Sequence, residues 1–103
     1  MSSDEEFVAW TLASLLTSCE GGAAEFSTKL LKLRTGFSGQ RLESALARIR
    51  EVVDHRGRAW RVLGLALRKE HHPARVVLVR SDRPDAADYL KRYYRSRLRP
   101  LHE

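Results

Sequence analysis

The sequence offers few residue pairs that could act in catalysis or bind a metal. His71 and His72 are adjacent, so on a strand or loop they point in different directions, and no cluster of Asp, Glu or Cys accompanies them. Asp54-His55 has the residue types of half a catalytic pair, but no Ser or Cys with the signature of an activated nucleophile accompanies it. The sequence therefore predicts no metal site, no cofactor and no enzyme.

Cys19 and the glycines do not supply the missing chemistry. Cys19 is the only cysteine, so it can form no internal disulfide, and its place in an apolar helical stripe is typical of a small buried thiol. Gly21-Gly22 and Gly36-x-x-Gly39 lack the spacing of phosphate-binding loops. The acidic first residues and the lack of a long apolar run predict neither secretion nor a membrane span, so we expect an intracellular protein, nuclear or cytoplasmic.

Positive charge is the chemical feature that remains. The chain has 103 residues and a net charge of +6, which is divided unevenly along it. Residues 1–25 hold five acids and no Lys or Arg, a net charge of −5, whereas the rest holds 19 bases and 8 acids, a net charge of +11. We therefore expect the chain after Phe26 to present a basic surface to a polyanion, with the first helix facing elsewhere.

That first helix is expected from about residue 4 to about residue 18. Ser3 and Glu6 have the spacing of a capping box. Phe7 and Trp10 project away from the main apolar stripe and form a second apolar patch. We expect the C-terminal helix of the same chain to cover this patch; the alternative is a second protomer or a partner protein.

A short helix and a longer one follow. Residues 23–26 suit a brief strand, and Ser27 is the expected cap of a helix from Thr28 to about Arg34. We expect this short helix to bury its leucines and expose its lysines, which are Leu30, Leu31, Leu33, Lys29 and Lys32.

After a Gly-containing turn, the stretch Phe37–Val53 is predicted as the central helix, with Ser38 as its cap. One apolar stripe recurs at helical spacing, formed by Leu42, Ala45, Leu46, Ile49 and Val53. The opposite face carries hydrogen-bonding side chains, namely Gln40, Arg41, Ser44, Arg48 and Glu51. A short helix, a Gly-containing turn and a polar-faced helix are the parts of a helix-turn-helix, although any amphipathic helix has a solvated polar face.

The period then changes to that of strands. Gly57 is the expected stop of the central helix. Residues 59–67 and 74–79 are predicted as the two strands of a hairpin, with a bulge near Leu63-Gly64. Residues 68–73 would form its basic tip.

A last helix should open at Ser81–Asp85 and run to about Leu98. We expect Leu90, Tyr94 and Leu98 to hold it against the first helix. Its cations Lys91, Arg92, Arg95 and Arg99 should gather on one outer face beside Tyr89 and Tyr93.

The order of these elements resembles a winged helix-turn-helix, an α+β fold with a three-helix core, a two-stranded wing hairpin and here an extra C-terminal helix, in a single domain of residues 1–103. Gly21-Gly22, Arg41-Leu42 with Leu46, and Val76–Val79 resemble the small winged domains of RNA-regulatory proteins, namely LOTUS domains and the N-terminal modules of the zinc-finger antiviral type. That resemblance implies binding to RNA or to RNA partners, whereas the superfamily at large implies binding to duplex DNA.

We therefore predict a non-enzymatic nucleic-acid-binding module for RNA or DNA that acts in gene or transcript regulation. The alternative is a protein-interaction or dimerisation domain that uses the Phe7 and Trp10 face. The predicted nucleic-acid contacts are Lys29, Lys32, Gln40, Arg41, Ser44, Arg48, Arg68, Lys69, Lys91, Arg92 and Arg95.

Overall fold

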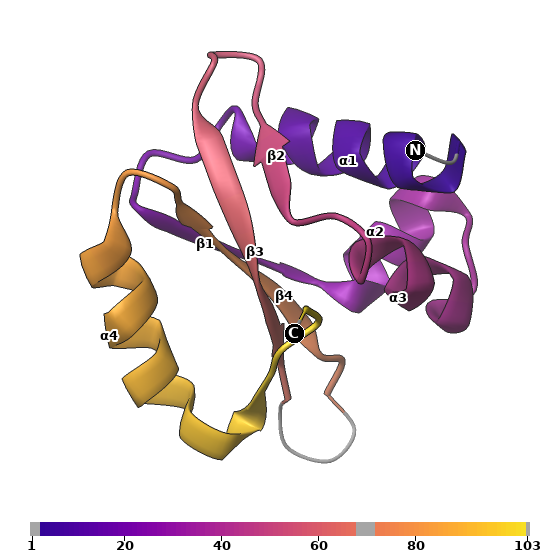
Figure 1. Ribbon diagram of the computed structural model, residues 1–103. Helices are drawn as coiled ribbons and strands as arrows, with labels where there is room; N and C mark the ends of the chain where they lie inside the picture. The colour runs from indigo at the N-terminus through magenta and orange to yellow at the C-terminus, as the bar shows by residue number, and fades with distance from the viewer. Residues whose placement is uncertain (1–2, 68–71, 103) are drawn as a thin grey trace.

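An antiparallel sheet separates two layers of helices in the computed structural model, which describes residues 3–67 and 72–102 (Figure 1). The elements are α1 (Ser3–Leu16), β1 (Ala23–Ser27), α2 (Thr28–Thr35), α3 (Gly39–Leu46), β2 (Glu51–Val53), β3 (Ala59–Ala66), β4 (Arg75–Arg80), α4 (Pro84–Tyr94), a 3-10 turn (Arg95–Arg97) and β5 (Leu98–Arg99). The strand order is β1-β4-β3-β2, and β5 pairs with β3. The α+β class is as predicted.

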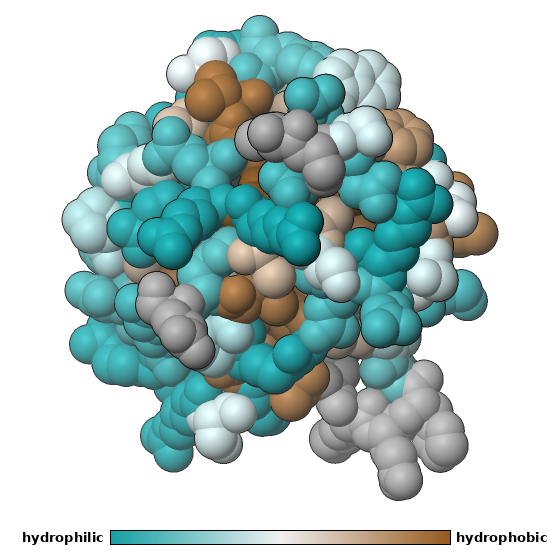
Figure 2. All heavy atoms as spheres, turned by 45° about the vertical axis from the view of Figure 1, so that its right-hand side comes forward, coloured by the Kyte–Doolittle hydropathy of each residue, from teal (hydrophilic) through white to brown (hydrophobic). Residues whose placement is uncertain are grey.

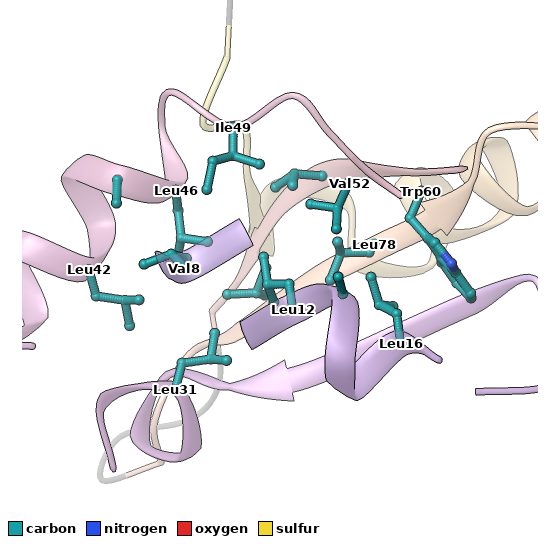
Figure 3. Packing of buried hydrophobic residues seen from close by; sticks show 14 of the residues in the cluster. Val8, Leu12, Leu16, Leu31, Leu42, Leu46, Ile49, Val52, Trp60 and Leu78 are labelled. Atoms are coloured by element: carbon teal, nitrogen blue, oxygen red, sulfur yellow. The ribbon is translucent and has the colours of Figure 1, made fainter. Parts of the chain in front are cut away.

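The main core lies between the sheet and the layer formed by α1, α2 and α3. Val8, Leu12 and Leu16 recur every four residues along α1 and are fully buried. Figure 3 shows them between leucines of α2 and α3 on one side and Trp60 and Leu78 of the sheet on the other. Each such side chain contributes about 1.5–3 kcal/mol when its apolar surface leaves water, so α1 is the central element of this layer.

Local signals in the sequence set the starts of α2 and α3. The Ser27 hydroxyl accepts a hydrogen bond from the Leu30 backbone N–H at 3.0 Å, and the Ser38 hydroxyl accepts one from that of Arg41 at 3.2 Å. Both predicted caps are therefore confirmed. The predicted hairpin is also confirmed, with its register shift between Val62 and Gly64.

The central helix is much shorter than predicted. It ends at Leu46, and residues 51–53 form β2, in which Val52 lies opposite Trp60 of β3. Ile49 of the predicted stripe is buried, but Val53 is 55% exposed, because alternation in β2 turns Val52 into the core in its place. Branching at Cβ disfavours a helix and suits a strand, and the strand partner supplied by β3 is not visible locally. Gly57, with φ +79°, lies in the β2–β3 turn and does not stop a helix.

The two flanking helices also depart from the prediction. In α2 only Leu31 of the three leucines is fully buried, and Leu33 is 77% exposed, because an eight-residue helix presents one narrow face to the core. Helix α1 ends at Leu16, two residues before its predicted end at about residue 18.

The C-terminal helix lies on the other side of the sheet from α1 (Figure 1). Helix α4 packs on β4 and buries Ala87. It ends at Tyr94, four residues before the predicted end at Leu98, because Arg95 takes a φ of +52°. The chain then returns to the sheet, where β5 pairs with β3. The prediction that this helix packs on the first one and covers Phe7 and Trp10 is therefore wrong, since the sheet lies between them.

One buried carboxylate joins the β2–β3 turn to the end of α1. Asp54 Oδ1 accepts the backbone N–H groups of Arg56 and Arg58 at 2.8 and 3.0 Å. Its Oδ2 accepts Arg58 Nε at 2.7 Å and Trp60 Nε1 at 3.0 Å. Burial alone would raise the pKa of Asp54, but these hydrogen bonds outweigh it and hold the pKa far below its ordinary value.

Arg58 then reaches the last carbonyls of α1. Its Nη1 donates to the Cys19 oxygen at 2.8 Å, and its Nη2 donates to those of Leu16 and Thr17 at 2.9 and 3.2 Å. A cation suits this end of a helix, where the carbonyls have no partner within the helix.

Asp54→Asn should lower the melting temperature by more than about 10 °C at pH 7, because it leaves a buried guanidinium without its counter-ion. Because the pKa of Asp54 is lowered by folding, the folded state binds fewer protons than the unfolded state. The stability that the Asp54 carboxylate contributes is therefore present above the ordinary Asp pKa of about 3.9 and is lost as pH falls below it. The stability gap between wild type and variant should close with acid, as measured by urea unfolding at several pH values. Asp82→Asn, in an exposed pair with Arg80, should give no such gap.

Gly64→Ala should loosen the C-terminal segment. A Cβ on Gly64 would lie 2.5 Å from the Arg99 carbonyl oxygen, and the φ of +155° disfavours a side chain there. We expect a melting temperature lower by about 5 °C or more and faster exchange of the Leu67 amide, which donates to Arg97 O at 2.8 Å. The matched control is Gly21→Ala, whose Cβ would meet its nearest neighbour at 3.8 Å. Equal behaviour of the two variants would contradict the assignment.

Candidate nucleic-acid interface

Arg41 of α3 is held by the acidic end of α1. Its Nε and Nη2 donate to the two oxygens of Asp4, each at 2.8 Å, and its guanidinium lies 4.0 Å above the ring of Phe37. The hydrogen bonds from Arg41 lower the pKa of the Asp4 carboxyl. Arg41 is therefore exposed but already occupied by a bidentate carboxylate, the same geometry in which it would take a phosphate.

Arg48 has a similar neighbour. It lies after the end of α3, and its Nη1 is 3.5 Å from Oε1 of Glu5. Gln40 and Ser44 are exposed and line the same groove as these two ion pairs. The expectation that the first helix faces away from the basic surface is thus wrong here, because folding brings its acids to the cations of α3.

The other side of α3 is flanked by the C-terminal segment. Gln40, Ser44 and the segment from Arg99 to Leu101 line one hollow, and Arg99 forms an ion pair with Glu43. Arg99 is therefore separated from the cations with which it was expected to share a helix face. Glu51 also leaves the predicted polar face, since it lies in β2 and accepts a hydrogen bond from Ser81 Oγ at 3.2 Å.

The α2 lysines lie on another part of the surface. Lys29 and Lys32 are exposed and form no ion pair with a described residue. Lys32 borders an apolar hollow that includes Leu42 and Leu65. In Figure 2 the side that carries α2 and α3 is turned forward, and it is mostly hydrophilic with apolar residues between. The predicted contacts Arg68 and Lys69 lie outside the described residues.

A second basic region surrounds the end of α4. Lys91 and Arg92 lie on α4, and Arg95 follows it. None of these three forms an ion pair within residues 3–67 and 72–102, and neither does Arg97, whose guanidinium lies 5.8 Å from the Tyr94 ring centre. The predicted contacts that the structure describes therefore lie on both sides of the sheet, those of α2 and α3 on one side and those around α4 on the other.

Exposed aromatic rings accompany these cations. Tyr89 and Tyr93, one helical turn apart on α4, are 60% and 58% exposed. Their rings are nearly parallel, with centres 6.3 Å apart and planes at 17°. Tyr93 also meets Tyr94 edge to face at 5.0 Å. Exposed, mutually aligned rings among cations form a surface on which planar groups can stack.

A cleft that no local sequence pattern predicts lies beside these tyrosines. Glu25 of β1 and Arg75 of β4 line it together with Tyr93, Tyr94 and Arg97, and its volume is about 260 Å³. Alternation along β1 was the available signal, because Ala24 and Phe26 face the core and Glu25 must then face the α4 side. The residues opposite Glu25 come from distant parts of the chain and could not be paired with it by local pattern.

The chain offers little other site chemistry. The Cys19 thiol donates to the Leu15 carbonyl at 3.6 Å, and burial raises its pKa, which opposes nucleophilic use. Among the described residues, no three His, Cys, Asp or Glu side chains come together as a metal site would need, and His71 lies outside them. Within the same residues, no helix is both long and apolar enough to span a membrane.

Asp4→Asn should release Arg41 for phosphate. We expect tighter binding of duplex DNA at low salt and a salt dependence steeper by up to about 0.9 in log–log slope, the value of one phosphate contact. Fluorescence anisotropy over a salt series measures both. The control is Glu20→Gln, which neutralises an exposed acid paired with Arg56 at 3.6 Å. A gain no larger than that of the control would mean that only net charge matters.

Comparison with known protein families, with curated proteins and with solved structures finds no match. The comparisons therefore show no family for this chain. Function must be inferred from the chain's own residues.

Proposed function

We propose that this domain is a non-enzymatic module that binds single-stranded nucleic acid through the surface around α4. This α4 surface comprises Tyr89, Arg92, Tyr93, Arg95 and Arg97. The observation that carries the proposal is the aligned, exposed pair of Tyr89 and Tyr93 among cations that have no ion-pair partner in the described part of the chain. Stacking of a base on an aromatic ring contributes about 1–3 kcal/mol, and the cations attract the phosphates.

Single strands suit this surface better than a duplex suits α3. A duplex hides its base faces, whereas a single strand can stack its bases on tyrosine. A phosphate at α3 would have to displace Asp4 from Arg41 and approach Glu5 beside Arg48. We therefore expect the α4 cations to contribute more to binding than Arg41 and Arg48. From the sequence alone, Arg41 and Arg48 were the expected main contacts.

The winged helix-turn-helix remains our proposal for the fold type. The order α1, β1, α2, α3 and a hairpin supports it, as does the pairing of β1 with the second hairpin strand, β4. Strand β2 and the α4–β5 return are additions to that plan. A role in gene or transcript regulation, within the nucleus or cytoplasm, accords with binding to RNA or single-stranded DNA.

Protein interaction is a second candidate, supported by the apolar side chains that α1 leaves in solvent. Trp10 is 62% exposed and Phe7 is 41% exposed. The Trp10 ring lies with its centre 6.3 Å from that of His55 in the β2–β3 turn. Large exposed aromatic residues are enriched at protein interfaces, so this face suits a partner or a second copy.

Tyr89→Ala should weaken binding of a labelled uridine oligonucleotide by about fivefold or more, because it removes a stacking ring while leaving every cation in place. Fluorescence anisotropy at about 50 mM salt measures the change. Trp10→Ala, which removes an exposed ring on the other side of the sheet, is the matched control and should change binding less than about twofold.

The proposal fails if no single strand, RNA or DNA, binds wild type more tightly than about 100 µM at low salt, since nonspecific phosphate attraction alone reaches that range. Equal losses for Tyr89→Ala and Trp10→Ala would also contradict it. If Tyr89→Ala has no effect, but Trp10→Ala changes the sedimentation coefficient of the protein or its binding to a partner protein, the second candidate is favoured.

A further inference from the structure

The cleft beneath α4 contains a carboxylate oxygen with no partner. Glu25 Oε1 is buried and accepts no hydrogen bond from residues 3–67 or 72–102. Arg75 and Arg97 line the same cleft, yet neither forms an ion pair with Glu25. A buried acceptor without a partner destabilises the protein, and a ligand that donates to it would remove that cost.

The other walls define the shape and charge of such a ligand. Tyr93 and Tyr94 supply aromatic surface, and the two arginines supply positive charge. A volume of about 260 Å³ lies just below the 300–1,000 Å³ typical of pockets for drug-sized ligands, so the cleft suits one ring system. Tyr93 belongs both to this cleft and to the exposed Tyr89–Tyr93 pair, so a strand stacked on that pair has a base beside the opening.

The mixture of charges fits a simple anion or cation poorly. A free phosphate could bind the arginines but has no donor to offer Glu25, and a lysine or arginine side chain could donate to Glu25 but would meet the like charges of Arg75 and Arg97. The ligand must therefore combine neighbouring hydrogen-bond donors for the carboxylate with negative charge for the arginines. A nucleotide has both, since its base is neutral and can supply hydrogen-bond donors, and its phosphate is anionic.

The geometry points to a guanine-binding cleft: Glu25 accepts the N1–H and the N2 amino group of one guanine, which stacks against Tyr93 while Arg75 or Arg97 contacts its phosphate. Guanine is the base that presents two adjacent donors on its Watson–Crick edge, and a carboxylate accepts such a pair in bidentate fashion. This inference rests on the proposed binding of single strands and adds a base preference to it.

Oligonucleotides that differ at one base test the inference. Labelled UUUGUUU should bind the full chain about tenfold more tightly than UUUAUUU, as expected for one good bidentate contact. Replacing the guanosine by inosine, which lacks the N2 amino group, should remove most of that difference. Anisotropy titrations at one fixed salt concentration give the three affinities.

Glu25→Gln keeps the shape of the side chain and replaces one acceptor oxygen by a donor. The ratio of guanine to adenine affinity should fall to within about twofold, while binding of an all-uridine strand changes little. Glu20→Gln, the matched loss of one negative charge at a distance from the cleft, should keep the wild-type ratio. Circular dichroism and melting temperature confirm that both variants are folded.

The outcomes separate the two proposals. If strands bind without preference for guanine, or if Glu25→Gln keeps the preference, the guanine-binding cleft is wrong and binding by the α4 surface stands. If no strand binds at all, the proposed function fails and the cleft inference fails with it.

Discussion

The fold depends on a charge that is buried and fully satisfied. Asp54 loses its hydration inside the protein, and four donors from its own turn and from Trp60 replace that hydration. Arg58, the partner of Asp54, uses its remaining donors on the carbonyls at the end of α1. One ion pair thus joins the β2–β3 turn of the sheet to the end of α1, and α1 in turn contributes the leucines around which α2 and α3 pack. The α3 groove, which lies in the helical layer, is therefore positioned through this joint.

The arrangement of charge follows from where α1 begins. Its first turn is acidic, which favours the helix dipole, and the same carboxylates lie beside Arg41 and Arg48. The α3 region is therefore close to neutral, whereas the region around the end of α4 keeps its positive charge. A polyanion that approaches the protein is attracted more strongly to the second region.

Much of the local structure could be predicted from the sequence, because its causes are local. Ser27 and Ser38 cap helices through backbone groups three residues away, and the bulge at Gly64 follows from a change of phase within one strand. Errors arose where a distant partner decides the structure. Val52 extends as a strand because β3 lies beside it, and Arg41 is occupied by a carboxylate 37 positions earlier in the chain. The cleft at Glu25 has the same origin, since β1, β4 and the C-terminal turn must all be in place before it exists.

Because strand β5 attaches the end of α4 to the sheet, few residues of α4 itself are needed to hold it in place. The helix buries little of itself, Ala87 being its one buried residue, yet both of its ends are attached to the sheet, through β4 before it and β5 after it. It is held near the sheet by this double tether, which raises its effective concentration there, more than by its own contacts. Most of its side chains are therefore not constrained by packing. Over evolutionary time the outer positions of α4 can change identity at small cost to stability, so the chemistry of this surface can change while the fold is preserved.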